Sequence, residues 1–193
     1  MPIWVWKMNK NFIENNYIVI DNFIEKDKAL ELYENFAKDA ELNPNASYLD
    51  AQFLDCFCAY NYKPFLLLLC EKLNEVSTLI EEPLLPTYTF ARLYKNGSEL
   101  IPHVDNARCE VSITLNLYGD KEWPIWFTKP NNEKISVTLK PGQAVVYSGM
   151  ISEHWRTEYE GEIYAQVFLH YVRVNGDHWL NYFDRMQNGI LIK

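Results

Sequence analysis

The residues of this chain whose types and spacing could do chemistry are two histidines and one aspartate. His103 and Asp105 are separated by a single residue, and His154 lies far downstream. Two imidazoles and one carboxylate form a facial triad, which holds one face of an Fe(II) ion and leaves the other face open. Because residues i and i+2 lie on the same face of a β-strand, we expect His103 and Asp105 to bind one ion together, with His154 supplied by a neighbouring strand.

The sequence around these residues is more informative than the motif, since a His-x-Asp motif also fits a surface turn after a strand. The segment 94–97, Tyr-Lys-Asn-Gly, predicts the end of a strand and a turn shortly before His103. The segment 140–147 predicts a Pro-Gly turn and a buried strand leading towards His154. This order resembles the Fe(II)/2-oxoglutarate-dependent dioxygenases, specifically their prolyl-4-hydroxylase-like branch. The resemblance covers residues 86–173, and the N-terminal segment 17–36 looks like the opening strand and helix of that family.

The resemblance implies a double-stranded β-helix, or jelly roll, that holds iron through His103, Asp105 and His154. It also implies 2-oxoglutarate and O2 as cosubstrates, with ascorbate as a candidate reductant. Such an enzyme couples oxidative decarboxylation of 2-oxoglutarate to succinate with hydroxylation of a substrate. Tyr94 matches the family tyrosine whose hydroxyl reaches the 2-oxoglutarate tail, although a core aromatic with a polar tip would also fit this position.

The sequence departs from the family where a cation is expected. The prolyl-hydroxylase pattern has Arg or Lys about ten residues after the distal histidine, whereas residues 161–164 here are Gly-Glu-Ile-Tyr. A dicarboxylate buried without a cation would carry a large desolvation cost. Arg156 is the first candidate for this cation, because it would share the inward face of His154 and could bind a carboxylate through two parallel hydrogen bonds.

The other candidates for the cosubstrate pocket rest on weaker signals. Arg92 shares the face of Tyr94, and Arg173 is the third candidate cation; each arginine could instead be a solvated surface cation. Thr114 and Gln166 are candidate pocket-lining residues. We interpret His170 and His178 as hydrogen-bonded core or pocket residues. Because iron halogenases of this superfamily replace the carboxylate ligand with a small residue, the presence of Asp105 favours hydroxylation.

The elements that must position these residues can be read from periodicity. The apolar spacing predicts a strand at Tyr17–Asp21 and amphipathic helices at Glu25–Leu42 and from Pro64 to about Ile80. Strand patterns separated by turn signals follow at Tyr88–Tyr94, Cys109–Leu117, Trp123–Phe127, Ile135–Leu139, Ala144–Tyr147 and Tyr164–Val172. The chain is therefore predicted to be mostly β with flanking α, a sandwich whose N-terminal helices pack on one sheet.

The strand predicted at residues 109–117 indicates what lies on each side of its sheet. Along residues 109–117 apolar side chains alternate with Glu110, Ser112, Thr114 and Asn116. This pattern fits a sheet whose polar side faces water, or one whose polar side lines a wet cavity while helices cover the apolar side. We expect a single domain over residues 1–193, with the N-terminal strand and helices in 1–83, the jelly-roll core in 84–174 and a tail in 175–193.

The composition indicates which cellular compartment and which binding partners to expect. The net charge of −8 disfavours nucleic acid and anionic lipid as partners. No signal peptide or membrane-spanning segment is predicted. The four cysteines lack the spacing of a zinc site or a disulfide framework, which predicts reduced core thiols and a cytoplasmic protein.

The substrate is less well defined by the sequence. An amino-acid or peptidyl substrate, with a prolyl residue as one candidate, would fit, and the segments 43–55 and 128–134 are candidate covering loops. The alternative is a cupin-like metal-dependent isomerase or small-molecule binding protein without oxygen chemistry. Binding of 2-oxoglutarate only when iron is present would discriminate the two. The sequence leaves the oligomeric state open.

Overall fold

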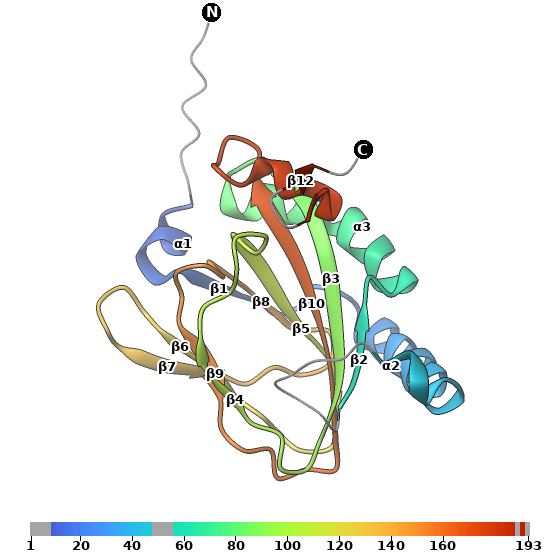
Figure 1. The fold of residues 1–193 in the computed structure, drawn as a ribbon. Coiled ribbons are helices and arrows are strands. Elements are labelled where there is room, and N and C mark those ends of the chain that lie inside the picture. Colours follow the sequence, from blue (N-terminus) through green and yellow to red (C-terminus); the bar gives the residue numbers. More distant parts are fainter. Residues whose placement is uncertain (1–8, 48–55, 188–189, 192–193) are drawn as a thin grey trace, which may run out of the picture.

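The core of the protein is a pair of antiparallel sheets, seen in a computed structural model that describes residues 9–47, 56–187 and 190–191 (Figure 1). The larger sheet has the strand order β1-β8-β5-β10-β3-β2, and the smaller one has the order β4-β9-β6-β7. The larger sheet comprises β1 (Tyr17–Ile20), β2 (Phe57–Tyr60), β3 (Leu84–Lys95), β5 (Val111–Gly119), β8 (Ala144–Tyr147) and β10 (Ile163–Arg173). The smaller sheet comprises β4 (Leu100–His103), β6 (Ile125–Thr128), β7 (Lys134–Val137) and β9 (His154–Arg156).

The α-helices lie towards the N-terminus: α1 (Lys10–Asn15), α2 (Lys26–Leu42) and α3 (Lys63–Ile80), with the short 3-10 helix η1 (Pro44–Ala46) after α2. After β10 come the 3-10 helix η2 (Trp179–Asp184) and a final pair of strands, β11 (Met186–Gln187) and β12 (Ile190–Leu191). In Figure 1, α2 and α3 lie along one side of the larger sheet, and the smaller sheet lies on the other side.

The face of the larger sheet that meets the helices is apolar. Helix α3 buries one stripe, which includes Phe65, Leu69 and Val76, because apolar residues recur at helical spacing. These side chains belong to one cluster with alternate residues of the strands, such as Leu115 on β5 and Val167 on β10. Many of the alternate residues are polar, such as Ser112, Thr114 and Asn116 on β5, and they lie on the opposite face of the sheet. The prediction of a double-stranded β-helix with helices packed on one sheet is confirmed.

Most of the predicted elements are present, with ends that differ by a few residues. Strand β1, helices α2 and α3 and the six predicted later strands all occur. The predictions missed α1, β2 and β4, which are four to six residues long, and also the 3-10 helices η1 and η2 and the two-residue strands β11 and β12. One cysteine prediction was wrong: Cys70 is exposed on α3, whereas Cys56, Cys58 and Cys109 are buried. A short element or a residue at the edge of a helix stripe has too little periodicity for a reliable assignment.

Two loops bear on the site. The Pro-Gly turn before β8 requires its glycine, because Gly142 has φ of +89° and an added Cβ would lie 2.4 Å from the carbonyl oxygen of Ile24. The candidate covering loop 128–134 is a turn between β6 and β7, closed by a Lys129–Glu133 ion pair of 2.7 Å. Residues 48–55 of the other candidate loop lie outside the described residues. Among the described helices, none is long and apolar enough to cross a membrane.

Candidate metal centre

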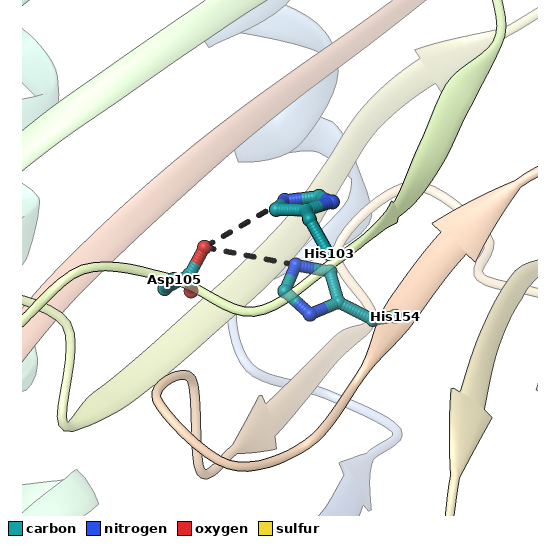
Figure 2. A group of neighbouring side chains, drawn as sticks. All are labelled: His103, Asp105 and His154. Carbon is teal, nitrogen blue, oxygen red and sulfur yellow. Dashed lines mark ion pairs between the residues drawn. The ribbon is translucent and has the colours of Figure 1, made fainter.

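The three predicted ligands converge at one end of the smaller sheet. His103 ends β4, His154 begins β9, and the two are register partners. Nε2 of His103 lies 3.8 Å from Oδ1 of Asp105, and Nε2 of His154 lies 3.7 Å from the same oxygen (Figure 2). One donor atom from each residue lies within 4.8 Å of the other two. The predicted grouping of two imidazoles and one carboxylate is therefore present in the structure.

Asp105 reaches this position in a different way from the one expected. Strand β4 ends at His103, so strand alternation does not place the aspartate. Instead the backbone N–H of Asp105 donates to the carbonyl of Gly149, at 2.8 Å, in the connection between β8 and β9. A Cβ at Gly149 would lie 2.3 Å from the carbonyl oxygen of Cys109 and 2.6 Å from Oδ2 of Asp105. A glycine is required there because the carboxylate lies directly against that backbone.

Each histidine has one ring nitrogen engaged and the other turned towards Asp105. Nδ1 of His103 lies 2.8 Å from the carbonyl oxygen of Ile101, and Nδ1 of His154 lies 2.9 Å from that of Ser152. A carbonyl can only accept, so each Nδ1 carries the proton and each Nε2 has a lone pair for a metal. Burial lowers the pKa of His154, which favours the neutral imidazole that metal ligation needs.

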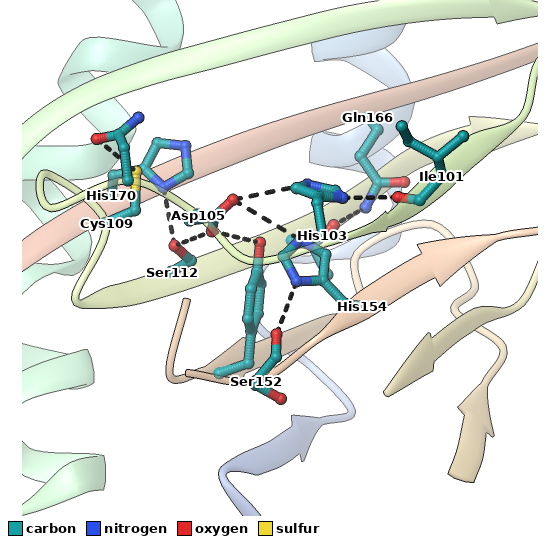
Figure 3. A network of polar contacts seen from close by, with 12 residues as sticks. Ile101, His103, Asp105, Cys109, Ser112, Ser152, His154, Gln166 and His170 are labelled. Carbon is teal, nitrogen blue, oxygen red and sulfur yellow. Dashed lines mark hydrogen bonds and ion pairs between the residues drawn. The ribbon is translucent and has the colours of Figure 1, made fainter. Parts of the chain in front are cut away.

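The two oxygens of the Asp105 carboxylate have different partners. Oδ1 faces the two imidazoles, whereas Oδ2 accepts hydrogen bonds from Oγ of Ser112, at 3.0 Å, and from the hydroxyl of Tyr147, at 3.3 Å. Oγ of Ser112 lies in turn 2.9 Å from Nδ1 of His170 (Figure 3). Sequence reasoning did not find Ser112 or Tyr147. The polar alternation on the strand around Ser112 was the only available signal.

A second group of potential metal ligands shares Asp105 with the first. It consists of Asp105, Cys109 and His170, all within reach of one ion. Burial raises the pKa of the Cys109 thiol far above its usual range, and its Sγ lies 3.1 Å from the hydroxyl of Tyr88. Burial also lowers the pKa of His170 to about 4, and its Nδ1 is engaged by Ser112. A protonated thiol is a poor ligand, so the two-histidine group is the better metal site.

Beyond the metal ligands, the interior contains a buried cation. Arg156 lies on β9 two residues after His154 and is only 1% exposed. Its guanidinium donates to the carbonyl oxygen of Trp123 and, at 2.8 Å, to Oε1 of Gln166. It also lies over the rings of Trp123 and Tyr164. Among the described residues it forms no ion pair with a carboxylate, so its charge is compensated there only by neutral acceptors and rings. A cation in this state favours an anionic ligand.

Four other pocket candidates lie on adjacent strands of the larger sheet, and one of them, Gln166, contacts this guanidinium directly. Nε2 of Gln166 donates to Oγ1 of Thr114, and Gln166 pairs in register with Arg92. Nη1 of Arg92 donates to the fully buried hydroxyl of Tyr94, at 3.2 Å. Five predicted residues thus line one region: Tyr94, Arg92, Thr114, Gln166 and Arg156. Arg173, the third candidate cation, lies apart from these residues: it ends β10, and its guanidinium is paired with Glu82, at 2.6 Å, and Glu110, at 3.7 Å.

Comparisons with known proteins identify the fold. No protein-family model and no curated protein matches the sequence. Among solved structures, a Pseudomonas putida prolyl-4-hydroxylase has a TM-score of 0.63 at 13% identity, covering 83% of this chain and 94% of its own. HygX from Streptomyces hygroscopicus, with nickel and 2-oxoglutarate bound, has a TM-score of 0.67 at 13% identity, covering 88% and 87%. SnoN, a non-heme α-ketoglutarate-dependent epimerase from nogalamycin biosynthesis, has a TM-score of 0.67 at 10% identity, covering 83% and 79%. The chain has the double-stranded β-helix fold of these oxygenases.

Proposed function

We propose that this protein is an Fe(II)- and 2-oxoglutarate-dependent dioxygenase. His103, Asp105 and His154 would hold the iron, and the enzyme would couple conversion of 2-oxoglutarate to succinate with hydroxylation of an amino-acid or peptidyl substrate. The observation that carries the proposal is the arrangement of the triad: each histidine has its Nδ1 hydrogen-bonded to a carbonyl, and both Nε2 atoms converge on Oδ1 of Asp105. Two imidazoles and one carboxylate are the donor set of non-heme Fe(II) oxygenases.

The buried guanidinium supports 2-oxoglutarate as the cosubstrate. Arg156 can offer parallel N–H donors to the carboxylate of the cosubstrate that lies farther from the metal. Gln166 and Thr114 would hold one side of that pocket, and Tyr94 with Arg92 the other. A dicarboxylate would provide the anion that Arg156 lacks among the described residues.

The division of work follows from these placements. When bound, iron with 2-oxoglutarate supplies the activation of oxygen, while the protein supplies positioning and exclusion of water. His103, Asp105 and His154 hold one face and leave the other face open. Asp105 fills the position that a halide would need, so the ligand set favours hydroxylation over halogenation. The proposed substrate class rests on the sequence resemblance.

The test is an anaerobic titration of the purified protein with Fe(II), followed by 2-oxoglutarate. A weak visible charge-transfer band is expected upon addition of 2-oxoglutarate, and glutarate, which lacks the keto oxygen, should give none. The band should be absent in His103→Ala. Arg156→Ala should bind Fe(II) as the unmodified protein does but require far more 2-oxoglutarate for the same band.

Two other results would reject the proposal. Iron binding without a band would indicate the cupin-like alternative, a metal protein without this oxygen chemistry. A failure to bind iron would show that the triad is not a metal site. If Arg156→Ala bound 2-oxoglutarate normally, a different residue would have to bind the far carboxylate.

A further inference from the structure

Three buried side chains that are not in the ligand set lie behind Asp105. Ser112 lies on β5, His170 on β10 and Tyr147 at the end of β8. All three side chains are buried, with exposed fractions of 0%, 5% and 1%. Ser112 and Tyr147 both contact Oδ2, the carboxylate oxygen that does not face the histidines. Figure 3 shows Ser112 between Asp105 and His170. The three side chains come from neighbouring strands of the larger sheet, since β5 pairs with both β8 and β10.

The number of protons fixes the direction of these hydrogen bonds. An ionised carboxylate can only accept, so Ser112 and Tyr147 must both donate to Oδ2. A serine hydroxyl has one proton, and Ser112 uses it on Asp105. Its oxygen must therefore accept from Nδ1 of His170, at 2.9 Å, so the imidazole carries its proton on Nδ1. The result is a directed chain from His170 through Ser112 to Asp105, with Tyr147 as a second donor to the same oxygen.

This arrangement has a consequence for metal binding. A carboxylate can bind a metal through one oxygen or chelate it through both, and chelation would occupy a coordination position that ligands and oxygen need. Two hydrogen bonds on Oδ2 oppose its rotation towards the ion and leave Oδ1 as the metal-facing oxygen. We propose that Ser112, Tyr147 and His170 are positioning residues that keep Asp105 a single-oxygen ligand, with His170 acting through Ser112. This inference rests on the proposed metal site.

The experiment measures Co(II) affinity and the visible Co(II) spectrum of the full-length protein, by titration in competition with a chelator. Ser112→Ala and Tyr147→Phe should each weaken Co(II) binding about 10- to 100-fold, the usual effect of removing a hydrogen bond to a metal ligand. Their Co(II) spectra should be weaker and shifted, as expected when a second carboxylate oxygen joins the ion. Tyr171→Phe is a matched control, because it removes a buried hydroxyl that bonds the carbonyl of Leu69 instead.

A double-mutant cycle tests the direction of the chain. His170→Phe should weaken Co(II) binding less than Ser112→Ala does, because it removes only the donor to Ser112. In a Ser112→Ala background, His170→Phe should have no further effect, whereas Tyr147→Phe should still weaken binding, because Tyr147 donates to Oδ2 directly. Thermal unfolding of each metal-free variant shows whether the fold is kept, and Tyr147→Phe, which removes only a hydroxyl, carries the test if Ser112→Ala does not fold.

The outcomes separate this inference from the proposed function. If the unmodified protein binds no Co(II) or Fe(II), the proposed metal site fails. If it binds the metal but Ser112→Ala and Tyr147→Phe match Tyr171→Phe in affinity and spectrum, the metal site stands and the positioning role is wrong. Additive losses for Ser112→Ala and His170→Phe would reject the chain through Ser112.

Discussion

Along β5, the two faces of the larger sheet are equally buried but chemically opposite. On the helix side, Ile113 and Leu115 of β5 are fully buried among apolar side chains. On the other side, Ser112 and Thr114 of the same strand are also fully buried, yet each is hydrogen-bonded to a polar neighbour. Burial alone therefore does not distinguish the part of this protein that stabilises the fold from the part that forms the site.

The difference lies in what each face gains from burial. Full burial of a leucine contributes about 1.5–3 kcal/mol, whereas a typical internal hydrogen bond contributes only about 0.5–1.5 kcal/mol net. The apolar face should therefore carry most of the stability. The polar face gains less from burial, and its composition is better explained by the metal ligands and the guanidinium that it surrounds. Substitutions on the two faces should then affect different measurements.

The largest expected effect is the loss of metal binding in His103→Ala. One of three ligands is removed, so Fe(II) or Co(II) affinity should fall by more than about 100-fold, while the free energy of unfolding of the metal-free protein should change by less than about 1 kcal/mol. The histidine is a partly exposed residue at the end of β4, so few packing contacts are lost. Calorimetric metal titration and urea unfolding give the two numbers. A large loss of stability without loss of affinity would contradict the contrast between the faces.

The helix-side counterpart is Leu115→Ala, which should destabilise the protein by about 2–5 kcal/mol because it leaves a cavity in a fully buried cluster. The metal affinity of the folded fraction should stay within about threefold of the unmodified value. Urea unfolding with the same metal titration, performed at low temperature where the variant is folded, checks both. A tenfold loss of affinity would show that the two faces are mechanically coupled.

A smaller effect is expected for Arg156→Lys, which keeps the charge but loses the fork of parallel donors. The affinity for 2-oxoglutarate should fall about 10- to 100-fold, and metal affinity should not change. Arg173→Lys is the matched control, since that arginine is paired with Glu82 and Glu110 away from the pocket. The measurement is the concentration of 2-oxoglutarate that gives half of the visible band. Equal losses in both variants would remove Arg156 from the cosubstrate pocket.

The two faces of the larger sheet could be predicted from the sequence, but the short strands that carry the histidine ligands could not. Alternation along residues 109–117 and helical spacing in 64–80 are long patterns, and they gave the correct layers. The metal ligands were predicted from the order of the motif and its flanking turns, because the His-x-Asp motif alone also fits a surface turn. The strands β4 and β9 span four and three residues, which is too short for periodicity to define.

What could not be predicted depends on contacts between distant segments. The place of Asp105 is set by the carbonyl of Gly149, and nothing near residue 105 indicates that partner. The absence of a carboxylate beside Arg156 among the described residues is a property of the packed interior. Ser112 and Tyr147 reach the same oxygen only because β5 and β8 pair in one particular register. Such facts require the three-dimensional structure.

The smallest effect is expected where both faces end, at the junction between β5 and β10. The exposed carboxylate of Asp120 has its pKa lowered to about 2: desolvation acts to raise it, but hydrogen bonds from the backbone N–H groups of Glu162 and Ile163 and from the hydroxyl of Tyr159 outweigh that effect. Because the pKa is lower in the folded state, this stabilisation is present above about pH 4 and is lost as the pH falls towards 2.

Asp120→Asn should therefore flatten the loss of stability between about pH 4 and pH 2. Because the carboxylate is exposed and screened by solvent, the cost at neutral pH should be below about 1 kcal/mol. Urea unfolding of both proteins across this pH range provides the measurement. Glu160→Gln is the control, because Glu160 is an exposed carboxylate of the β9–β10 connection whose ion pair with Lys121 spans 4.0 Å. Metal affinity at neutral pH should be unchanged, because the junction touches neither the ligands nor the donors to Asp105. An acid dependence that survives in Asp120→Asn would mean that other carboxylates set it, and a loss of metal affinity would extend the functional face to the end of the sheet.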